Sequence, residues 1–238
     1  MEELAYTSVD GVWLDGLQFC SQAYRLFERL MAHSDGPTRL RTRTGPFERK
    51  LITEILPLAH YLKSAYSLGR YIDVCWHSGN QPYDAEFRQR GEYVEQGRLP
   101  QSGYFEITTA QHPDEHLARE RLATEGFLFS VHNLRATATK RNPDRRIVSE
   151  PVVFSNGSFV DDMARFVLNA IEAKAAKGYS PGYMLIVQCT LNHLYLSDDW
   201  NALADNVRRH LPESDFHEIW MCADEMPNDR KAILKSSL

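Results

Sequence analysis

Three short runs rich in β-branched and aromatic residues follow one another in the middle of the chain: Tyr71–Trp76, Tyr83–Phe87 and Gly103–Thr109. The turn-forming stretch Ser78-Gly79-Asn80-Gln81-Pro82 separates the first two. Such runs are typical of strands, and no helical crossover pattern lies between them. The three runs therefore predict an antiparallel meander of neighbouring strands.

Helical and strand patterns alternate after this meander. A helix is expected from Pro113 to Thr124, then another opened by Asp161-Asp162, the strand Tyr183–Cys189, a helix that starts at Asp198-Asp199, and a last strand, Phe216–Cys222. A β-α-β unit of this kind forms a right-handed crossover with parallel strands. The predicted fold is therefore α/β, a mixed sheet flanked by helices.

The 238 residues suit a single domain, 1–238. Residues 1–46 read as an N-terminal helical extension, with apolar residues at helical spacing from Leu17 to Met31 and a loop at Gly36-Pro37. The core is expected over 47–222, beginning with a helix from Phe47 to Tyr66 that Pro57 should kink. An insertion with irregular or hairpin structure is expected at about 127–159.

Composition limits the classes of protein that this chain can belong to. The net charge of −5 argues against a generally basic nucleic-acid coat protein but permits a local basic groove. The four cysteines form no CxxC pair, and three of them lie in apolar runs, so buried free thiols in a reducing compartment are expected. The N-terminus lacks the apolar core of a secretory signal, and no run approaches a membrane span. We therefore expect a cytoplasmic protein with no membrane partner.

Two acids stand out on the predicted meander. Pro82-Tyr83-Asp84 opens the second strand, and Glu106-Ile107-Thr108 lies on the third, with a helix and a further strand after it. This arrangement resembles the PD-(D/E)xK nuclease superfamily, whose core is called restriction-endonuclease-like. The resemblance covers roughly residues 47–222. It implies a restriction-endonuclease-like core that binds Mg²⁺ (or Mn²⁺) and hydrolyses phosphodiesters of nucleic acids.

The resemblance also assigns roles to residues of this chain. Asp84, Glu106 and the backbone carbonyl of Ile107 would be the metal ligands, since magnesium prefers hard oxygen ligands. Thr108 stands where the family has its catalytic lysine, and a hydroxyl can position water but cannot supply a positive charge. Arg119 or Arg121 on the following helix could point back and replace that lysine.

Each acid also has a purely structural interpretation. An Asp after a Pro turn often serves as a turn or cap residue, and Glu106 between Phe105 and Ile107 fits a strand with one solvated face. Glu54 and Glu86 are further acidic candidates. Two hypotheses therefore stay open: a metal-dependent nuclease, and a catalytically inactive nuclease-fold protein that binds nucleic acid or another protein.

Two segments gather basic residues in predicted loops, where long cationic side chains reach phosphates easily. The candidate nucleic-acid-binding residues are Arg39, Arg41 and Arg43 in the first segment, and Arg135, Lys140, Arg141, Arg145 and Arg146 in the second. Two solvated loops would give the same pattern. In an acidic protein, however, such clusters indicate a local positive field.

The sequence contains no motif for zinc binding, serine hydrolysis or nucleotide binding of the common classes. The nine histidines are scattered, and His112 and His116 have no matching carboxylate motif for zinc. No G-x-S-x-G, P-loop or GxGxxG occurs, so the sequence offers no support for a serine hydrolase or a nucleotide-binding motif of those classes.

Overall fold

A computed structural model gives the fold and describes residues 5–139, 141–142, 144–153, 155–180, 182–191, 196–224 and 230–236. Its helices are α1 (Gly16–Ala32), α2 (Gly36–Thr42), α3 (Pro46–Lys50), the π-helical turn η1 (Leu51–Ile55), α4 (Leu56–Ala65), α5 (Glu92–Glu95), α6 (Glu115–Glu125), α7 (Asn156–Ala175) and α8 (Ser197–Arg209). Its strands are β1 (Leu14–Asp15), β2 (Tyr71–Trp76), β3 (Ala85–Arg90), β4 (Ser102–Ala110), β5 (Leu134–Ala136), β6 (Ile147–Ser149), β7 (Tyr183–Cys189), β8 (Glu218–Ala223) and β9 (Lys231–Ser236).

A mixed seven-stranded sheet forms the centre, in the order β1-β2-β3-β4-β7-β8-β9. The first four strands pair antiparallel, β4, β7 and β8 run parallel, and β9 returns antiparallel. The predicted meander and the predicted parallel pairing of Tyr183–Cys189 are confirmed. The α/β class with a mixed sheet is confirmed as well.

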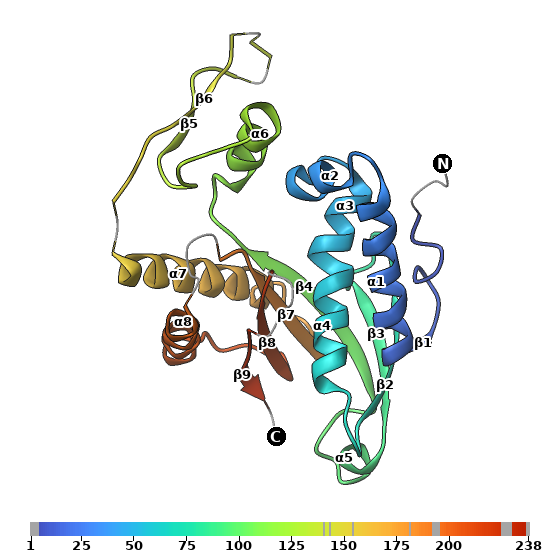
Figure 1. Cartoon of the computed structure of the whole chain (residues 1–238). Helices are drawn as coiled ribbons and strands as arrows, with labels where there is room; N and C mark the ends of the chain where they lie inside the picture. The colour runs from blue at the N-terminus through green and yellow to red at the C-terminus, as the bar shows by residue number, and fades with distance from the viewer. Residues whose placement is uncertain are drawn as a thin grey trace.

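Helices α1 to α4 lie on one face of the sheet and α7 and α8 on the other, whereas α5 and α6 lie beyond its two ends (Figure 1). One apolar core joins α1 and the α3–α4 helix to the inner residues of β2, β3 and β4, among them Phe87, Phe105 and Ile107. A second core joins α7 and α8 to Leu185 and Val187 on the opposite face of β7. Every residue of β7 is buried, because neighbouring strands flank it and helices cover both its faces.

The helix over 46–65 runs without a break, and its irregularity differs from the predicted kink. The Leu56 N–H bonds to the Leu51 carbonyl, one residue further back than in an α-helix, and this makes the π-turn η1. Pro57 lies directly after it, in the first turn of α4. Proline has no N–H and cannot make the usual helical hydrogen bond. The preceding turn widens to a π-turn, and the helix continues without a sharp bend.

Several predicted boundaries were wrong. Helix α7 begins at Asn156, not at Asp161, because the Ser155 hydroxyl caps it by accepting from the Ser158 N–H at 3.3 Å. The first basic segment is not a loop, since Pro37 lies in the first turn of α2 and Pro46 in that of α3. The final strand is β9, where exposed Lys231 and Ile233 alternate with buried residues.

The predicted insertion contains a small hairpin, β5–β6, which packs on α6 through a separate cluster around Leu117, Leu134 and Ile147. All four cysteines are buried free thiols, as predicted. Among the described residues no helix has the length and apolarity that crossing a bilayer requires.

Candidate active site

Asp84 and Glu106 lie opposite each other on adjacent strands. Ala85 pairs with Phe105, which brings Asp84, the residue before β3, next to Glu106 in β4. The Asp84 N–H donates to the Phe105 carbonyl at 2.9 Å, and the Asp84 Oδ2 accepts from the Ile107 N–H at 2.7 Å. The structure therefore brings the two sequence candidates together, with Asp84 anchored to the strand that carries Glu106.

Ile107 has its backbone directed toward Asp84. Backbone N–H and C=O groups of one strand residue point to the same side, and this side alternates along the strand. The Ile107 N–H points to the Asp84 carboxylate, so the Ile107 carbonyl faces the same edge. Strand β3 begins only at Ala85, opposite Phe105, so this carbonyl lies beyond the paired part of the two strands. It is the candidate for a third oxygen ligand at the site.

A lysine from a distant helix contacts Glu106. Lys174, near the end of α7, forms an ion pair with the Glu106 Oε1, and the Lys177 Nζ lies 3.7 Å from the same oxygen. The Glu106 side chain is only 7% exposed, so its carboxylate meets these cations where water is largely excluded. A positive charge therefore lies beside Glu106, and it comes from α7.

The two arginines proposed from the sequence do not serve the site. The Arg119 guanidinium binds Gln111 at 3.0 Å and Glu115 at 3.4 Å. Arg121 binds Glu125 at 2.7 Å and the Ile147 carbonyl, so it ties α6 to the hairpin. Among the described residues neither guanidinium contacts Glu106 or Asp84, so the expectation that one of them points back and replaces the lysine was wrong.

Of the two further acids, Glu54 belongs to the electrostatic neighbourhood and Glu86 does not. Glu54 in η1 has a raised pKa because of burial, and Glu106 adds to the increase, while Lys50 at 3.3 Å opposes it. Glu86 instead binds the His77 ring at 2.9 Å and the Tyr83 hydroxyl at 3.3 Å. The acidic cluster is therefore Glu54, Asp84 and Glu106.

Negative charge is crowded at this cluster. Burial raises the pKa of Asp84 from 3.8 to about 7, and the neighbouring charges of Glu106 and Glu54 raise it further, whereas the Ile107 N–H and Lys174 oppose the increase. A strongly perturbed carboxyl beside other acids is typical of functional sites. A divalent cation would relieve this repulsion.

The donor set fits magnesium better than zinc. Among the described residues no group of three or more His, Cys, Asp or Glu side chains is arranged to hold a metal ion. Magnesium needs fewer protein ligands, commonly one or two carboxylates completed by waters and substrate phosphates. Asp84, Glu106 and the Ile107 carbonyl would supply such a set.

A row of aromatic rings borders the acids. Tyr83 precedes Asp84, and its ring centroid lies 4.5 Å from that of Tyr104, which lies 5.0 Å from that of Tyr183. Tyr179 continues the row at 4.6 Å from Tyr183, and burial together with the charge of Glu106 raises its pKa. These rings pack against one another and against the core under α7 and α8, and they form an aromatic wall beside the carboxylates.

The basic segments are partly neutralised. Arg39 pairs with Glu48, Arg43 with Asp224 at 3.5 Å, Arg135 with Glu150 at 2.8 Å, and Arg145 with Glu120. Arg41, Arg141 and Arg146 are exposed and have no ion pair within the described residues; Lys140 lies outside them. Both segments lie at the end of the molecule where β4 ends (Figure 1).

Comparison with family models, with curated proteins and with solved structures finds no match for this chain.

The pKa of Asp84 predicts how stability depends on pH. Because the folded state holds the Asp84 proton up to about pH 7 and the unfolded chain releases it near 3.8, stability falls as pH rises through this interval. We expect Asp84→Asn to raise the free energy of unfolding at pH 8 by on the order of 2 kcal/mol, and the gain should vanish toward pH 4. Urea unfolding of the parent and of Asp84→Asn between pH 4 and pH 8 measures the difference in their free energies of unfolding.

The exposed Asp215 provides the control, since Asp215→Asn changes the same charge on the surface. Mg²⁺ should displace the Asp84 proton, so titration at pH 7 in weak buffer should release protons from the parent but not from Asp84→Asn. An equal gain for both Asn variants, or no gain at pH 8, would contradict the assignment.

Proposed function

We propose that this chain is a metal-dependent nuclease with a restriction-endonuclease-like core. Lys174 would take the role of the family's catalytic lysine, whose position in this chain is occupied by Thr108. The observation that carries the proposal is the contact between Lys174 and Glu106, opposite Asp84. Two carboxylates and a lysine from three separate elements converge at one place. A buried ion pair by itself contributes little to stability, so this arrangement is better explained by a functional role than by stability alone.

The residues present define the roles. Asp84, Glu106 and the Ile107 carbonyl would hold Mg²⁺ or Mn²⁺, and a bound ion of this kind polarises a phosphodiester and acidifies water. The Lys174 ammonium can donate to the attacking water or to a phosphate oxygen from its place beside Glu106. Thr108 lies two residues after Glu106 on the same strand face and adds a hydroxyl.

Cleavage assays on the full chain test the proposal. Labelled single-stranded DNA, double-stranded DNA and RNA are incubated with Mg²⁺, with Mn²⁺ or with EDTA. We expect hydrolysis with either metal and none with EDTA. Crystals soaked in Mn²⁺ should show an anomalous peak between Asp84 and Glu106. If no substrate is cut with either metal, the catalytic proposal is wrong, and binding without cleavage would support the inactive, nucleic-acid-binding alternative.

Nucleic-acid binding should depend on the unpaired cations of the second basic segment. Arg141→Glu and Arg146→Glu should each weaken binding and lower the slope of log affinity against log salt by about one, since each neutralised phosphate releases counterions. Fluorescence anisotropy at several salt concentrations measures this. Arg25→Glu, an exposed cation of α1, is the matched control. Arg145 is a poor test, because its reversal also breaks the pair with Glu120.

A further inference from the structure

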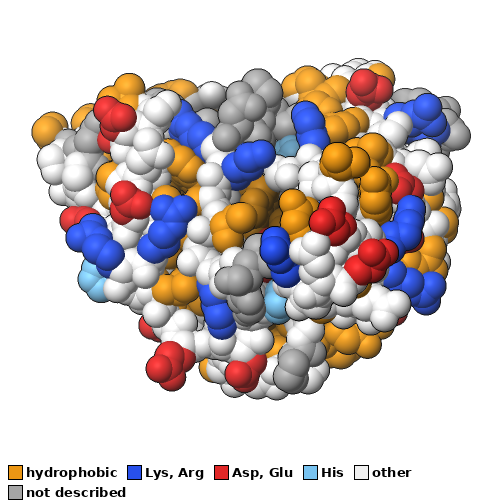
Figure 2. All heavy atoms as spheres, turned by 90° about the horizontal axis from the view of Figure 1, so that it is seen from below, with side chains coloured by type: hydrophobic (Ala, Val, Ile, Leu, Met, Phe, Trp, Pro, Cys, Tyr) orange, Lys and Arg blue, Asp and Glu red, His pale blue; other side chains and the backbone are white. Residues whose placement is uncertain are grey.

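A cavity of about 780 Å³ opens on the face of the sheet opposite Glu106. On this face α4 covers the middle of the sheet, and β8 and β9 extend beyond it. Trp220 of β8 and Ile233 of β9 line the cavity next to Tyr61 and Ala65 of α4. Ile233 is 51% exposed, so this apolar surface is not fully covered. Figure 2 shows the hollow face with hydrophobic side chains in its middle and Lys and Arg side chains around them.

Positive charge predominates in the cavity lining. Arg70, Arg98, Arg208 and Lys231 line it, whereas Glu218 is its single carboxylate among the described residues. The whole chain carries a net charge of −5, so this concentration of cations runs against the overall charge. A cavity with low-dielectric walls and one sign of charge attracts the opposite sign.

Arg70 is committed to the protein. Its Nε donates to the Gln89 amide oxygen at 2.9 Å, one terminal nitrogen donates to the Tyr61 hydroxyl at 2.7 Å, and the other lies 3.9 Å from Glu218. Glu218 is 3% exposed, so this pair neutralises a buried carboxylate. Arg70 therefore shapes the wall of the cavity rather than offering a free charge.

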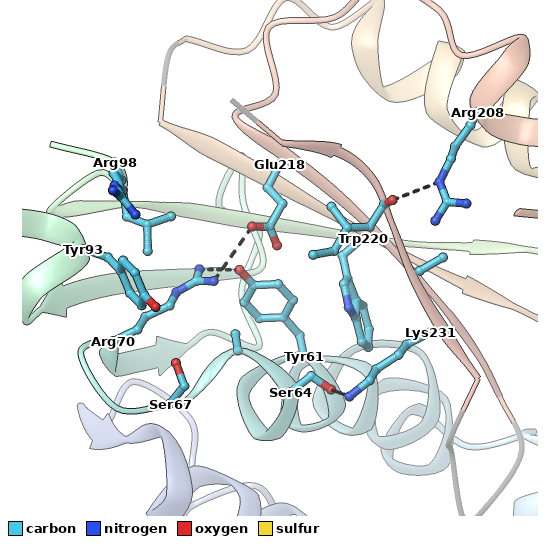
Figure 3. A pocket seen from close by; sticks show the side chains of 14 residues that line it. Tyr61, Ser64, Ser67, Arg70, Tyr93, Arg98, Arg208, Glu218, Trp220 and Lys231 are labelled. Carbon is cyan, nitrogen blue, oxygen red and sulfur yellow. Dashed lines mark hydrogen bonds and ion pairs between the residues drawn. The ribbon is translucent and has the colours of Figure 1, made fainter. Parts of the chain in front are cut away.

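Of the other cations, Lys231 and Arg98 have no ion pair among the described residues, and Arg208 shares its charge with the exposed Asp205. Lys231 donates only to a neutral partner, the Ser64 hydroxyl, at 3.1 Å, and Arg98 has no side-chain hydrogen bond or ion pair within the described part of the chain. Arg208 binds the Ile233 carbonyl at 3.2 Å and Asp205 at 2.9 Å. Figure 3 places Lys231 and Arg208 on one side of the cavity and Arg98 on the other, beside Tyr93.

This arrangement selects a ligand with two unlike parts. One part must carry more than one negative charge, to match Lys231 and Arg208. The other must be flat and largely apolar, to lie against Tyr93, which is 37% exposed, with Arg98 able to stack on the same ring system. The volume lies within the range of small-molecule sites. A nucleoside with two or three phosphates has both parts.

We propose that this cavity binds a nucleoside di- or triphosphate, with its phosphates at Lys231 and Arg208 and its base against Tyr93 and Arg98. The site lies on the other face of the sheet from Glu106, so it does not depend on the proposed nuclease function. Asp84→Asn should leave it intact.

Isothermal titration of the full chain with ADP, AMP, adenosine and inorganic pyrophosphate tests the proposal. We expect ADP to bind with a micromolar Kd, and AMP, adenosine and pyrophosphate each to bind at least about tenfold more weakly, because each lacks one part of the ligand. Lys231→Ala should weaken ADP about tenfold and leave adenosine unchanged. Tyr93→Ala should weaken ADP and adenosine but leave pyrophosphate unchanged.

Arg25→Ala on α1 removes one exposed cation outside the cavity and should leave ADP binding unchanged. Lys231 and Tyr93 are exposed, so their variants should fold, which circular dichroism checks. The proposal is overturned if ADP does not bind at millimolar concentration, if pyrophosphate binds as tightly as ADP, or if Arg25→Ala weakens ADP as much as Lys231→Ala does. The proposal would also be overturned if a single-stranded oligonucleotide displaced ADP at a concentration below the Kd of ADP, since the cavity would then bind nucleic acid in preference to the nucleotide.

Discussion

Asp84→Asn and Glu106→Gln should each lower Mg²⁺-dependent cleavage by more than about 100-fold, since even outer partners of metal ligands cost about 10–100-fold when changed. Both replacements keep the shape of the side chain. The Asn oxygen can still accept from the Ile107 N–H, so the anchor between the strands is retained. Under the proposed function, each variant would lose one negative oxygen ligand, and a bound Mg²⁺ would then be held too weakly to activate water.

Glu86→Gln is the matched control for these acids. Glu86 lies on β3 close to Asp84 in sequence but binds His77 and Tyr83, so its change should leave cleavage nearly unaltered. Single-turnover cleavage rates over a range of Mg²⁺ concentrations measure the effect. Retention of most of the parental rate by either Asp84→Asn or Glu106→Gln at saturating metal would refute the assignment.

Lys174→Ala should lower the cleavage rate by about 10²–10³-fold, the cost of removing one donor aimed at developing charge. Lys177→Ala should cost much less, because the Lys177 Nζ lies 3.7 Å from Glu106 and its side chain is 56% exposed. The rate at saturating Mg²⁺ and the metal dependence together distinguish the roles. Loss of Lys174 should reduce the rate more than it reduces metal affinity.

Thr108→Lys gives the decisive comparison. In the parent, where Lys174 already contacts Glu106, a second lysine should crowd the site and lower cleavage. In the Lys174→Ala background, the same change should restore part of the rate, because it returns a cation to the strand position. Full activity of Lys174→Ala would show that Lys174 does not supply the catalytic cation. If Lys174→Ala is inactive, failure of Thr108→Lys to restore any of the rate would show that a cation at the strand position cannot replace it.

Sequence patterns were sufficient for the parts of this protein that local interactions determine. A run rich in β-branched and aromatic residues identified β2, alternation of apolar and polar residues identified β4, and the continuous apolar run identified β7 with its observed bounds, Tyr183–Cys189. The pairing of Asp84 with Glu106 could be predicted because a turn joins the strands β2 and β3 and the next strand pairs beside them. Short elements with weak patterns were missed, among them β1, α2 and β9.

The chemistry of the site depends on contacts that sequence patterns do not encode. Lys174 lies 68 residues from Glu106, and near the end of a helix its charge has an adequate local explanation in the helix dipole. The one sequence feature that could have pointed to the Lys174–Glu106 contact was the β4–α7–β7 crossover, because it returns the end of α7 toward the beginning of β4. Ion pairs such as Arg145–Glu120 likewise reduce a basic cluster that is visible in the sequence.

The cavity beside α4 likewise depends on contacts that the sequence does not predict. Lys231, Arg98 and Tyr93 lie on three separate segments and have no common motif. Composition and periodicity determined that the chain would form a mixed sheet with helices on both faces, because burial of apolar residues depends on local spacing. Only the tertiary structure decided which charges meet, because electrostatic contacts depend on distances between residues far apart in the chain.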